Sequence, residues 1–489
     1  MSNLQQRQSK IQEKRKKTPW RQYVQEIASW ASLSLYKRGT AICRYPDTLR
    51  VNTIPRDQFI AMRDGISSDY SLNLDEDSIK SRSFFDNLKD LFAKTPLPYQ
   101  HLWQSENCDY TDTWGYSKNV YLSFLYGGTL ENACYCWNSK FSRNVYNSCA
   151  VWDNSENVYQ CTGITQSYNV FYSKNIHASR DIWLCSDMTG CEDCVQCRGL
   201  TNQKYMINNE QLTEEEYVGK KNEILSHKEQ FDEIYSAMQF NTDAQTGCED
   251  VVQSRVVYNI KSGRNVMYSG WWSTKERFYD VFAGWAEADF YGVYQWVNFA
   301  SHVYCSAHIN ASSNIFYSYS MNECSFCLGC VGLKNKSFCI LNKQYTKEER
   351  LLKIDEIFWR MDADGILWDA LPASLNPFYF NDTAAYLIDP SFSKEEVMKA
   401  WFMWRDQEIK VDIPDWMETV KKDDLDTYER VAEGGKRTLD ETILKKVILD
   451  EKGNAYRVVK MEYDFLVKYA LPLPRKHRLD RLKENFRVN

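Results

Sequence analysis

A short phrase of the form Ser-x-Asn-Val-Tyr-x-Ser recurs through the middle of the chain at steps of twelve or thirteen positions. Its central residue, called the anchor below, defines two series. The first series is Asn107, Asn119, Asn132, Asn144, Asn157, Asn169, Asp181 and Asp193. The second is Asp250, Asn265, Arg277, Asp289, His302, Asn314 and Phe326. No helical or coiled-coil pattern keeps this period, whereas the stacked coils of a solenoid do.

When the repeats are aligned on the anchor, like residues fall into columns. The position after the anchor is small and aliphatic, and the next position, the aromatic column, holds Tyr, Phe or Trp. The fourth position is Ser or Cys, and the seventh is large and apolar. Such columns are expected if coils stack at about 4.8 Å, with Asn at bends that require left-handed backbone geometry. One repeat per coil and two repeats per coil are both compatible with this pattern.

The two arrays are copies of one unit. The stretch that begins at Cys197 aligns with the stretch that begins at Cys330, and the identity continues through Asn202 and Asn335 and beyond. Each copy then reaches a capping-box motif, at Thr213 and at Thr346, with Glu three positions later. We therefore expect amphipathic helices near 214–237 and 347–361 that cover the open ends of the arrays.

The expected fold is mainly β, with two tandem duplicated β-solenoid (β-helix-like) arrays of 12–13-residue repeats, each capped by an α-helix. An α-helical N-terminal segment and a small α/β C-terminal piece complete it. The expected domains are a basic arm and helical region at 1–100, the first array at 101–240, the second array at 241–362, a helix and charged linker at 363–438, and the C-terminal piece at 439–489. Further helices are expected at 20–37, 83–94 and 393–405, with the charged segment of the linker at about 417–438.

Composition narrows the class of protein. The net charge of −6 provides no general attraction to nucleic acid or to an anionic membrane. No apolar run approaches the roughly 20 residues that span a bilayer, and the N-terminus is too polar for a secretory signal. We expect a cytoplasmic protein, with its 16 cysteines reduced. The histidines lie in no metal-ligand or nucleophile motif and no Gly-rich phosphate loop follows a strand, so we expect no enzymatic activity and no cofactor.

A Cys-x-x-Cys-x-x-Cys motif ends each array. Its cysteines are Cys191, Cys194, Cys197 and, in the second copy, Cys324, Cys327, Cys330. Alone, this spacing suggests zinc or iron–sulfur ligation. The same cysteines, however, occupy columns that hold Ser or small aliphatic residues in other repeats. The pattern favours buried free thiols, with metal ligation as the alternative.

The second array departs from the repeat pattern in one place, and such departures often mark function. The residues are Trp271, Trp272, Lys275, Arg277, Trp285, Glu287 and Trp296. Tryptophans beside paired charges can bind sugars, bases or a partner peptide. The alternative interpretation is a wider coil that is packed by Trp.

The chain resembles a group of proteins from the Patescibacteria (candidate phyla radiation) with Asn/Cys/Tyr-rich repeats and zinc-ribbon-like flanks. Stretches that carry the resemblance are 83–92, 335–349, 377–383, 444–448 and 471–477. The flanks of that group hold paired Cys for zinc, whereas here Cys43 stands alone in 30–65 and 446–480 has no Cys. The resemblance implies a C-terminal zinc ribbon that has lost its metal, held by Val458, Met461, Phe465 and Leu466. It implies no activity.

Three functions are compatible with these features. The first is a non-catalytic repeat scaffold that presents an aromatic-rich solenoid surface to a protein partner or to another copy of itself. The second is nucleic-acid binding through the basic termini, Lys14–Lys17 and Arg475–Arg481, with exposed tyrosines for stacking. The third is glycan binding through the Trp cluster. No membrane partner is expected.

Overall fold

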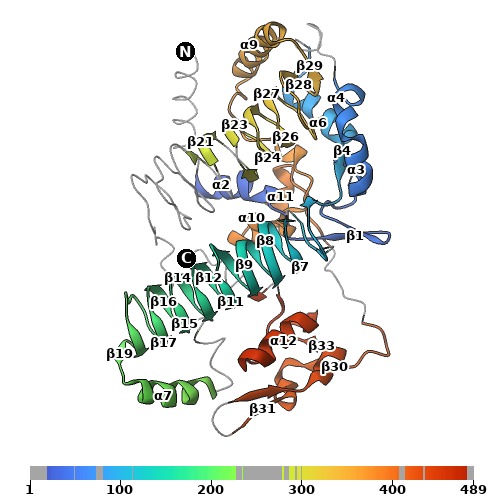
Figure 1. Ribbon diagram of the computed structural model, residues 1–489. Coiled ribbons are helices and arrows are strands. Elements are labelled where there is room, and N and C mark those ends of the chain that lie inside the picture. The colour runs from blue at the N-terminus through green and yellow to red at the C-terminus, as the bar shows by residue number, and fades with distance from the viewer. Residues whose placement is uncertain are drawn as a thin grey trace. The chain divides into compact units, whose positions relative to one another are not determined.

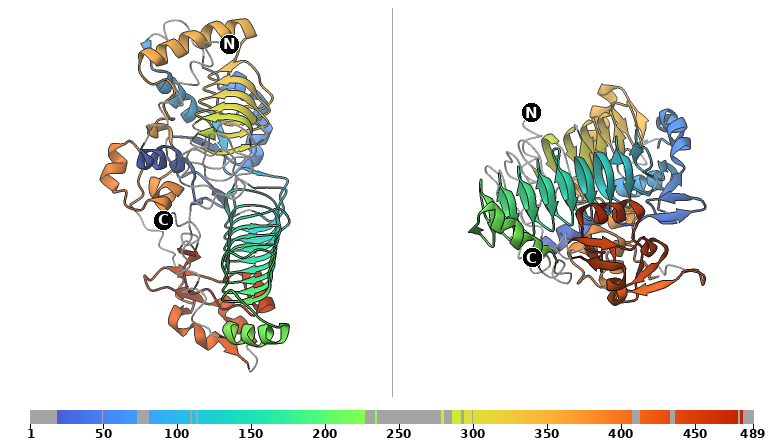
Figure 2. Two further views of the ribbon diagram at one scale, coloured as in Figure 1. Left: turned by 90° about the vertical axis from the view of Figure 1, so that its left-hand side faces the viewer. Right: turned by 60° about the horizontal axis from the view of Figure 1, so that its bottom comes forward.

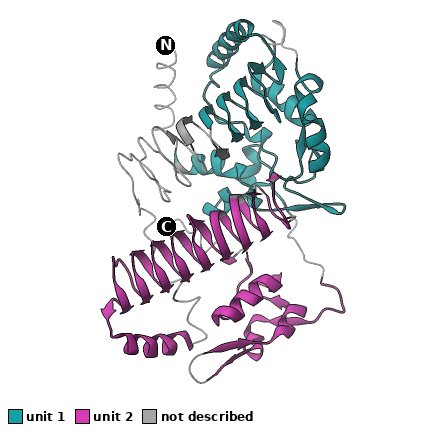
Figure 3. Ribbon diagram, viewed as in Figure 1, with its two compact units in different colours: residues 1–101, 242–406, 488 teal, residues 102–241, 407–487, 489 magenta. Residues whose placement is uncertain are grey.

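The computed structural model confirms a mainly β fold with solenoid arrays and helices at both ends of the sequence (Figure 1). It describes residues 19–48, 50–72, 81–108, 110–112, 114–226, 234, 278–279, 286–291, 294–298, 300–406, 413–432, 436–478 and 480–481. These residues belong to two compact units, each assembled from separate stretches of sequence (Figure 3). Unit 1 combines 1–101 with 242–406, and unit 2 combines 102–241 with 407–487.

The first array, in unit 2, is a stack of short parallel strands (Figure 2). In chain order they are β5 (Leu102–Trp103), β6 (Trp114–Gly115), β7 (Lys118–Tyr121), β8 (Phe124–Cys134), β9 (Trp137–Tyr146), β10 (Cys149–Trp152), β11 (Glu156–Tyr159), β12 (Thr162–Thr165), β13 (Tyr168–Phe171), β14 (Lys174–His177), β15 (Arg180–Trp183), β16 (Ser186–Thr189), β17 (Glu192–Val195) and β18 (Lys204–Ile207). Val158 pairs with Val170, and Val170 with Ile182. Because each pairing advances by one repeat, one coil holds one repeat.

The period of the repeat follows from the corners of the coil. In one coil the backbone is left-handed at Asn157 (φ 58°), Gln160 (φ 52°), Gly163 (φ 72°) and Gln166 (φ 51°), one residue in every three. Four corners, each three positions from the next, complete one repeat. Left-handed geometry costs most L-residues about 1–2 kcal/mol, and Asn and Gly tolerate it best, which explains the Asn anchors.

The residue after each corner points into the coil. Val158, Cys161, Ile164 and Ser167 are all at most 2% exposed. The small polar members of these columns bond to the backbone of neighbouring residues. Ser148 Oγ, for example, donates to the carbonyl of Tyr146 (2.7 Å) and accepts from the amide of Cys161 in the next coil (3.0 Å). Ser and Cys recur because the interior needs a small side chain that can make these bonds.

The second array, in unit 1, repeats this construction. Its strands are β20 (Phe278–Tyr279), β21 (Ala286–Tyr291), β22 (Tyr294–Asn298), β23 (Ala300–Tyr304), β24 (Ala307–Asn310), β25 (Ser313–Phe316), β26 (Tyr319–Asn322) and β27 (Ser325–Leu328). Val303 pairs with Ile315, which pairs with Cys327. The described coils therefore keep the interior columns of the first array.

The arrays also end alike, as expected from the duplication. The closing pairs of strands are β18 with β19 (Glu210–Gln211) and β28 (Cys339–Ile340) with β29 (Lys343–Gln344), both antiparallel. The helices α7 (Glu214–Ser226) and α9 (Lys347–Ala363) follow. Thr346 Oγ1 accepts from the Glu349 amide (3.2 Å), and Thr213 Oγ1 accepts from the Glu216 amide (3.3 Å). Both predicted capping boxes are confirmed.

Unit 1 also contains the N-terminal elements and the segment after α9. These elements are α2 (Trp20–Ile27), β1 (Tyr36–Arg38), β2 (Ala41–Cys43), β3 (Asn52–Ile54), α3 (Arg56–Met62), α4 (Ile66–Asp69), α6 (Phe84–Lys94), β4 (Pro96–Pro98), α10 (Ala384–Ile388) and α11 (Lys394–Lys399). The helix expected at 83–94 is confirmed. The helix expected at 20–37 was too long, because the chain turns to strand β1. The helix expected at 393–405 begins with Ser393 as its N-cap but ends at Lys399.

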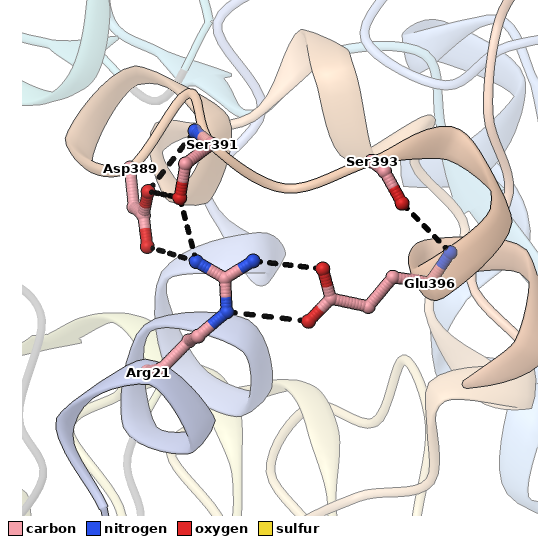
Figure 4. A network of polar contacts seen from close by, with 5 residues as sticks. All are labelled: Arg21, Asp389, Ser391, Ser393 and Glu396. Carbon is pink, nitrogen blue, oxygen red and sulfur yellow. Dashed lines mark hydrogen bonds and ion pairs between the residues drawn. The ribbon is translucent and has the colours of Figure 1, made fainter.

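Arg21 fastens α2 to the segment that leads into α11 (Figure 4). Its guanidinium reaches Asp389 at 2.6 Å and Glu396 at 2.7 Å, and donates to Ser391 Oγ at 2.7 Å. It also lies 3.8 Å above the ring of Phe392. Carboxylates on both sides raise the pKa of Arg21, the hydrogen bond to Glu396 contributing most. The two ends of unit 1 are thereby joined across more than 360 positions of sequence.

The C-terminal piece of unit 2 is the small α/β assembly that was expected. It consists of β30 (Thr419–Lys421), β31 (Glu429–Val431), β32 (Arg437–Leu439), β33 (Val447–Leu449), β34 (Ala455–Tyr456) and helix α12 (Lys460–Tyr469). The segment expected as a charged linker, 417–438, instead supplies three of these strands. Val458, Phe465 and Leu466 are buried in its core, with Met461 packed against them, which confirms their expected packing.

Candidate binding groove

Helix α12 packs on the aromatic column of the first array. The ring of Phe465 lies 4.4 Å from that of Tyr146, and the ring of Tyr469 lies 5.2 Å from that of Phe171. The helix therefore advances along the array as it advances in sequence. Tyr146, Tyr159 and Phe171 are at most 3% exposed. All of these residues belong to unit 2.

The expectation of exposed aromatic columns is wrong over these coils, because the chain covers them itself. The same holds in the second array, where Tyr304 and Phe316 are buried and lie 6.0 and 6.4 Å from the ring of Trp368. Phe358 of α9 adds a further ring 5.6 Å from Phe316. Large aromatic surfaces gain most from burial, so a column of rings attracts the nearest apolar helix.

A buried ion pair fixes α12 to the array. Glu462 is fully buried, and its Oε1 accepts from Arg481 (2.7 Å), from the side-chain amide of Asn147 (2.6 Å) and from the hydroxyl of Tyr159 (3.3 Å). Arg481 is only 2% exposed. A buried charge of this kind is tolerated only when it is paired. Glu462 thus holds α12 in one position on the coils.

Beside these rings, the first coils and the C-terminal piece line a groove of about 720 Å³. Its lining residues are Asn107, Tyr110, Asn119, Val120, Tyr121, Asn132, Asn144 and Tyr146 from the array, and Val459, Lys460, Met461, Asp464, Phe465 and Lys468 from the C-terminal piece. Ligand sites in proteins commonly measure about 300–1,000 Å³. Tyr110 is the most open aromatic residue of the lining, at 48% exposed.

The array side of the groove, called its floor below, includes a row of anchor side chains, the Asn ladder. Asn107 Nδ2 donates to Asn119 Oδ1 (2.9 Å), Asn119 to Asn132 (3.0 Å), and Asn132 to Asn144 (3.2 Å). The ladder continues beyond the groove through Asn157. Each amide is therefore held in one orientation, the same in every coil.

The walls carry rings on one side and mixed groups on the other. The rings of Tyr110 and Tyr121 lie 5.5 Å apart at 58°, and burial raises the pKa of Tyr121. On α12, Lys460 pairs with Asp464, and that hydrogen bond raises the pKa of Lys460. A hydrogen bond to Tyr469 raises the pKa of Lys468. The groove can offer hydrogen bonds, aromatic faces and a slight excess of positive charge.

The Trp cluster expected as a site lies mostly outside the described residues. Trp271, Trp272, Lys275, Arg277 and Trp285 all fall there. Glu287 is part of strand β21 and Trp296 is part of strand β22. The cluster stays a prediction.

The Cys-x-x-Cys-x-x-Cys motifs occupy successive interior positions of the last coils. The spacing of three is the spacing of inward-pointing residues, and Cys191, Cys194 and Cys197 are at most 2% exposed. Burial and a hydrogen bond to Cys197 raise the pKa of Cys185 well above its usual value. Cys324, Cys327 and Cys330 are likewise buried. Among the described residues, no three His, Cys, Asp or Glu side chains are grouped to hold a metal ion.

Several basic residues of the C-terminal segment form contacts within the C-terminal piece. Arg475 pairs with Asp426 at 2.5 Å, and Arg481 is buried on Glu462. The guanidinium of Arg478 is desolvated by burial, which lowers its pKa. Arg475 and Arg481 are therefore paired and Arg478 is buried, so these three arginines do not form a solvated arm.

No protein-family model, curated protein or solved structure matches the chain. Of the helices in the described part of the chain, none is long and apolar enough to cross a membrane. The stacked parallel strands of both arrays define the class of the chain, a β-solenoid repeat protein.

The repeat columns that make the floor and one wall of the groove were predicted from the sequence, but the groove itself was not. Asn107, Asn119 and Tyr121 were recognised as repeat positions, and Phe465 as a core residue of a separate piece. The missing information was that α12 lies on the aromatic column more than 300 positions earlier in the sequence. The one available signal was the size of that column, which is too apolar to remain uncovered.

Proposed function

We propose that the protein is a repeat scaffold that binds a protein partner through the groove between the first array and α12. The observation that carries this proposal is the groove lining, in which an ordered row of amides faces half-open tyrosine rings. The rigid coils hold these groups in place before a ligand arrives. Preorganisation reduces the entropy that binding costs.

The lining favours binding over chemistry. Its one carboxylate, Asp464, is paired with Lys460, and its other polar groups are amides, phenols and a second lysine. Nucleic-acid binding loses support at the C-terminus, because Arg475 and Arg481 make contacts within the C-terminal piece, whereas the other predicted basic segment, Lys14–Lys17, lies outside the described residues. A second copy of the chain, nucleic acid and a glycan remain the alternatives.

Affinity capture with a matched pair of variants tests the proposal. Tyr110→Asn removes a ring from the groove, whereas Tyr116→Asn removes a 61% exposed ring of the same array that does not line it. A polypeptide that the parent chain and Tyr116→Asn retain, and that Tyr110→Asn loses, would support the proposal. Equal retention by all three chains would contradict the groove as the binding site.

Size-exclusion chromatography with light scattering, at low and high salt, identifies the alternatives. A mass above 57.6 kDa at both salt concentrations that falls in Tyr110→Asn would mean that the partner is another copy. Co-eluting material with strong absorbance at 260 nm that leaves at high salt would replace the proposal with nucleic-acid binding.

A further inference from the structure

The Asn ladder presents an unused hydrogen-bonding capacity to the groove. A side-chain amide has two N–H donors and an oxygen with two lone pairs. In the ladder Asn119 uses one donor toward Asn132 and one lone pair toward Asn107. The ladder thus uses one N–H and one lone pair of each such amide, and the second N–H and lone pair lie outside the ladder on residues that line the groove.

The spacing of these amides selects among extended ligands. Coils stack about 4.8 Å apart, so alternate amides recur about every 9.6 Å. A polyproline II helix rises about 3.1 Å per residue with three residues per turn, a repeat of about 9.3 Å. The two repeats nearly match, so the carbonyl of every third residue of such a helix could accept a hydrogen bond from every second amide of the ladder. A β-strand repeats about every 6.8 Å, which lies between one coil and two.

The backbone of the array also disfavours a bound β-strand. In the solenoid the strands pair from coil to coil, as Val120 pairs with Ala133 and Ala133 with Val145. The floor of the groove therefore consists of side chains and offers no open sheet edge. Strand addition depends on such an edge. A polyproline II segment has no internal hydrogen bonds and needs only donors for its carbonyls.

The walls suit proline side chains. Tyr110 and Tyr121 supply aromatic faces, and Val459 and Met461 supply aliphatic surface on the other side. Aromatic-lined grooves are the common receptors for proline-rich segments. Lys460 is paired with Asp464, so Lys468 gives the lining one positive charge in excess. This charge favours a ligand with a carboxylate next to its proline-rich stretch.

We infer that the groove binds a proline-rich segment of a partner protein in the polyproline II conformation. The four amides from Asn107 to Asn144 span three coil steps, about 14 Å, which is the length of about five such residues. This inference rests on the proposed function and specifies the chemical class of the partner.

The test is a fluorescence-anisotropy titration of the full chain with a labelled peptide of ten prolines flanked by one glutamate. A Gly/Ser peptide of equal length and charge is the control probe. We expect saturable binding of the proline peptide and at least about fivefold weaker binding of the Gly/Ser peptide, since the latter must be ordered on binding. Tyr110→Asn should weaken the binding of the proline peptide at least about fivefold. Tyr116→Asn should leave that affinity unchanged.

Two comparisons separate the possible failures. Equal binding of both peptides, or no effect of Tyr110→Asn, would overturn the polyproline inference. If affinity capture still shows a partner that depends on Tyr110, the proposed function stands and only the ligand class is wrong. Binding of an oligosaccharide or of single-stranded DNA in place of the peptide, again dependent on Tyr110, would reassign the groove to that class. Circular dichroism of both variants checks that each is folded before the binding results are compared.

Discussion

At the scale of single residues, backbone geometry explains the repeat. A left-handed residue in every third position turns the chain four times per repeat, and an extra residue fits at a corner. Asp153 and Asn154 are consecutive left-handed residues (φ 54° and 63°) within one of the longer steps, where Asn144 leads to Asn157. Single residues also determine how the interior of the coil is filled, because the inward positions alternate between an aliphatic side chain and a small one.

His477, in the C-terminal piece, leads to a prediction about acid stability. Burial first, and then the nearby Arg478 and Arg481, lower its pKa from 6.5 to about 4, against an opposing effect of Asp480 and Asp450. Between these values the unfolded chain binds more protons than the folded chain, so stability falls as pH drops from about 6.5 to 4. The melting temperature of His477→Gln should therefore decrease less between pH 7 and pH 5 than that of the parent chain. An equal loss would show that His477 is not the responsible group.

At the scale of elements, each coil depends on its neighbours through side-chain ladders as well as backbone pairs. Asn157 is fully buried, accepts from Asn144 at 2.9 Å and donates to Asn169 at 3.0 Å. The ladder therefore transmits the orientation of one amide to the next. Such short strands would not be stable in isolation, and stacking supplies what they lack.

The ladder predicts a large effect from one amide. Asn157→Ala removes the ladder bonds of two half-buried partners, Asn144 and Asn169, and places Ala at a buried left-handed position, so we expect a loss of about 2–4 kcal/mol of unfolding free energy. Asn107→Ala shares the left-handed backbone cost (φ 54°) but lies at the exposed end of the ladder with a single ladder bond, to Asn119, so it should cost less, about 1–2 kcal/mol. Thermal unfolding followed by circular dichroism measures both. Similar losses for the two variants would argue against the ladder as a buried stabilising feature.

At the scale of the whole molecule, segments that are distant in sequence pack together to form each unit. The first array and the C-terminal piece share one apolar core, in which Phe465 lies against Tyr146 and Tyr159. The second array similarly forms one unit with the N-terminal helices. The groove exists only because α12 is held beside the Asn ladder.

Removing the ring of Phe465 should therefore release α12 before the solenoid unfolds. Phe465→Ala leaves a cavity that costs about 3–5 kcal/mol, whereas Val467→Ala changes a 44% exposed residue on the same helix and should cost little. Limited proteolysis should cut the parent chain and Val467→Ala slowly near 460–469, and Phe465→Ala quickly. Slow cleavage of all three would mean that Glu462 and Arg481 hold the helix without the ring.

The sequence alone determined the solenoid and its columns from the repeat period, the duplication from the alignment of the two copies, and the capping boxes from local motifs, because each of these is a pattern along the chain. It could not determine that Tyr146 and Phe171 are covered, or that Arg481 is buried on Glu462. The aromatic column packs against a helix from the far end of the sequence. The repeat pattern does not predict which distant apolar surface will pack on the column. The tertiary structure decided that pairing, since buried aromatic area and one paired charge favour α12 there, and the groove follows from it.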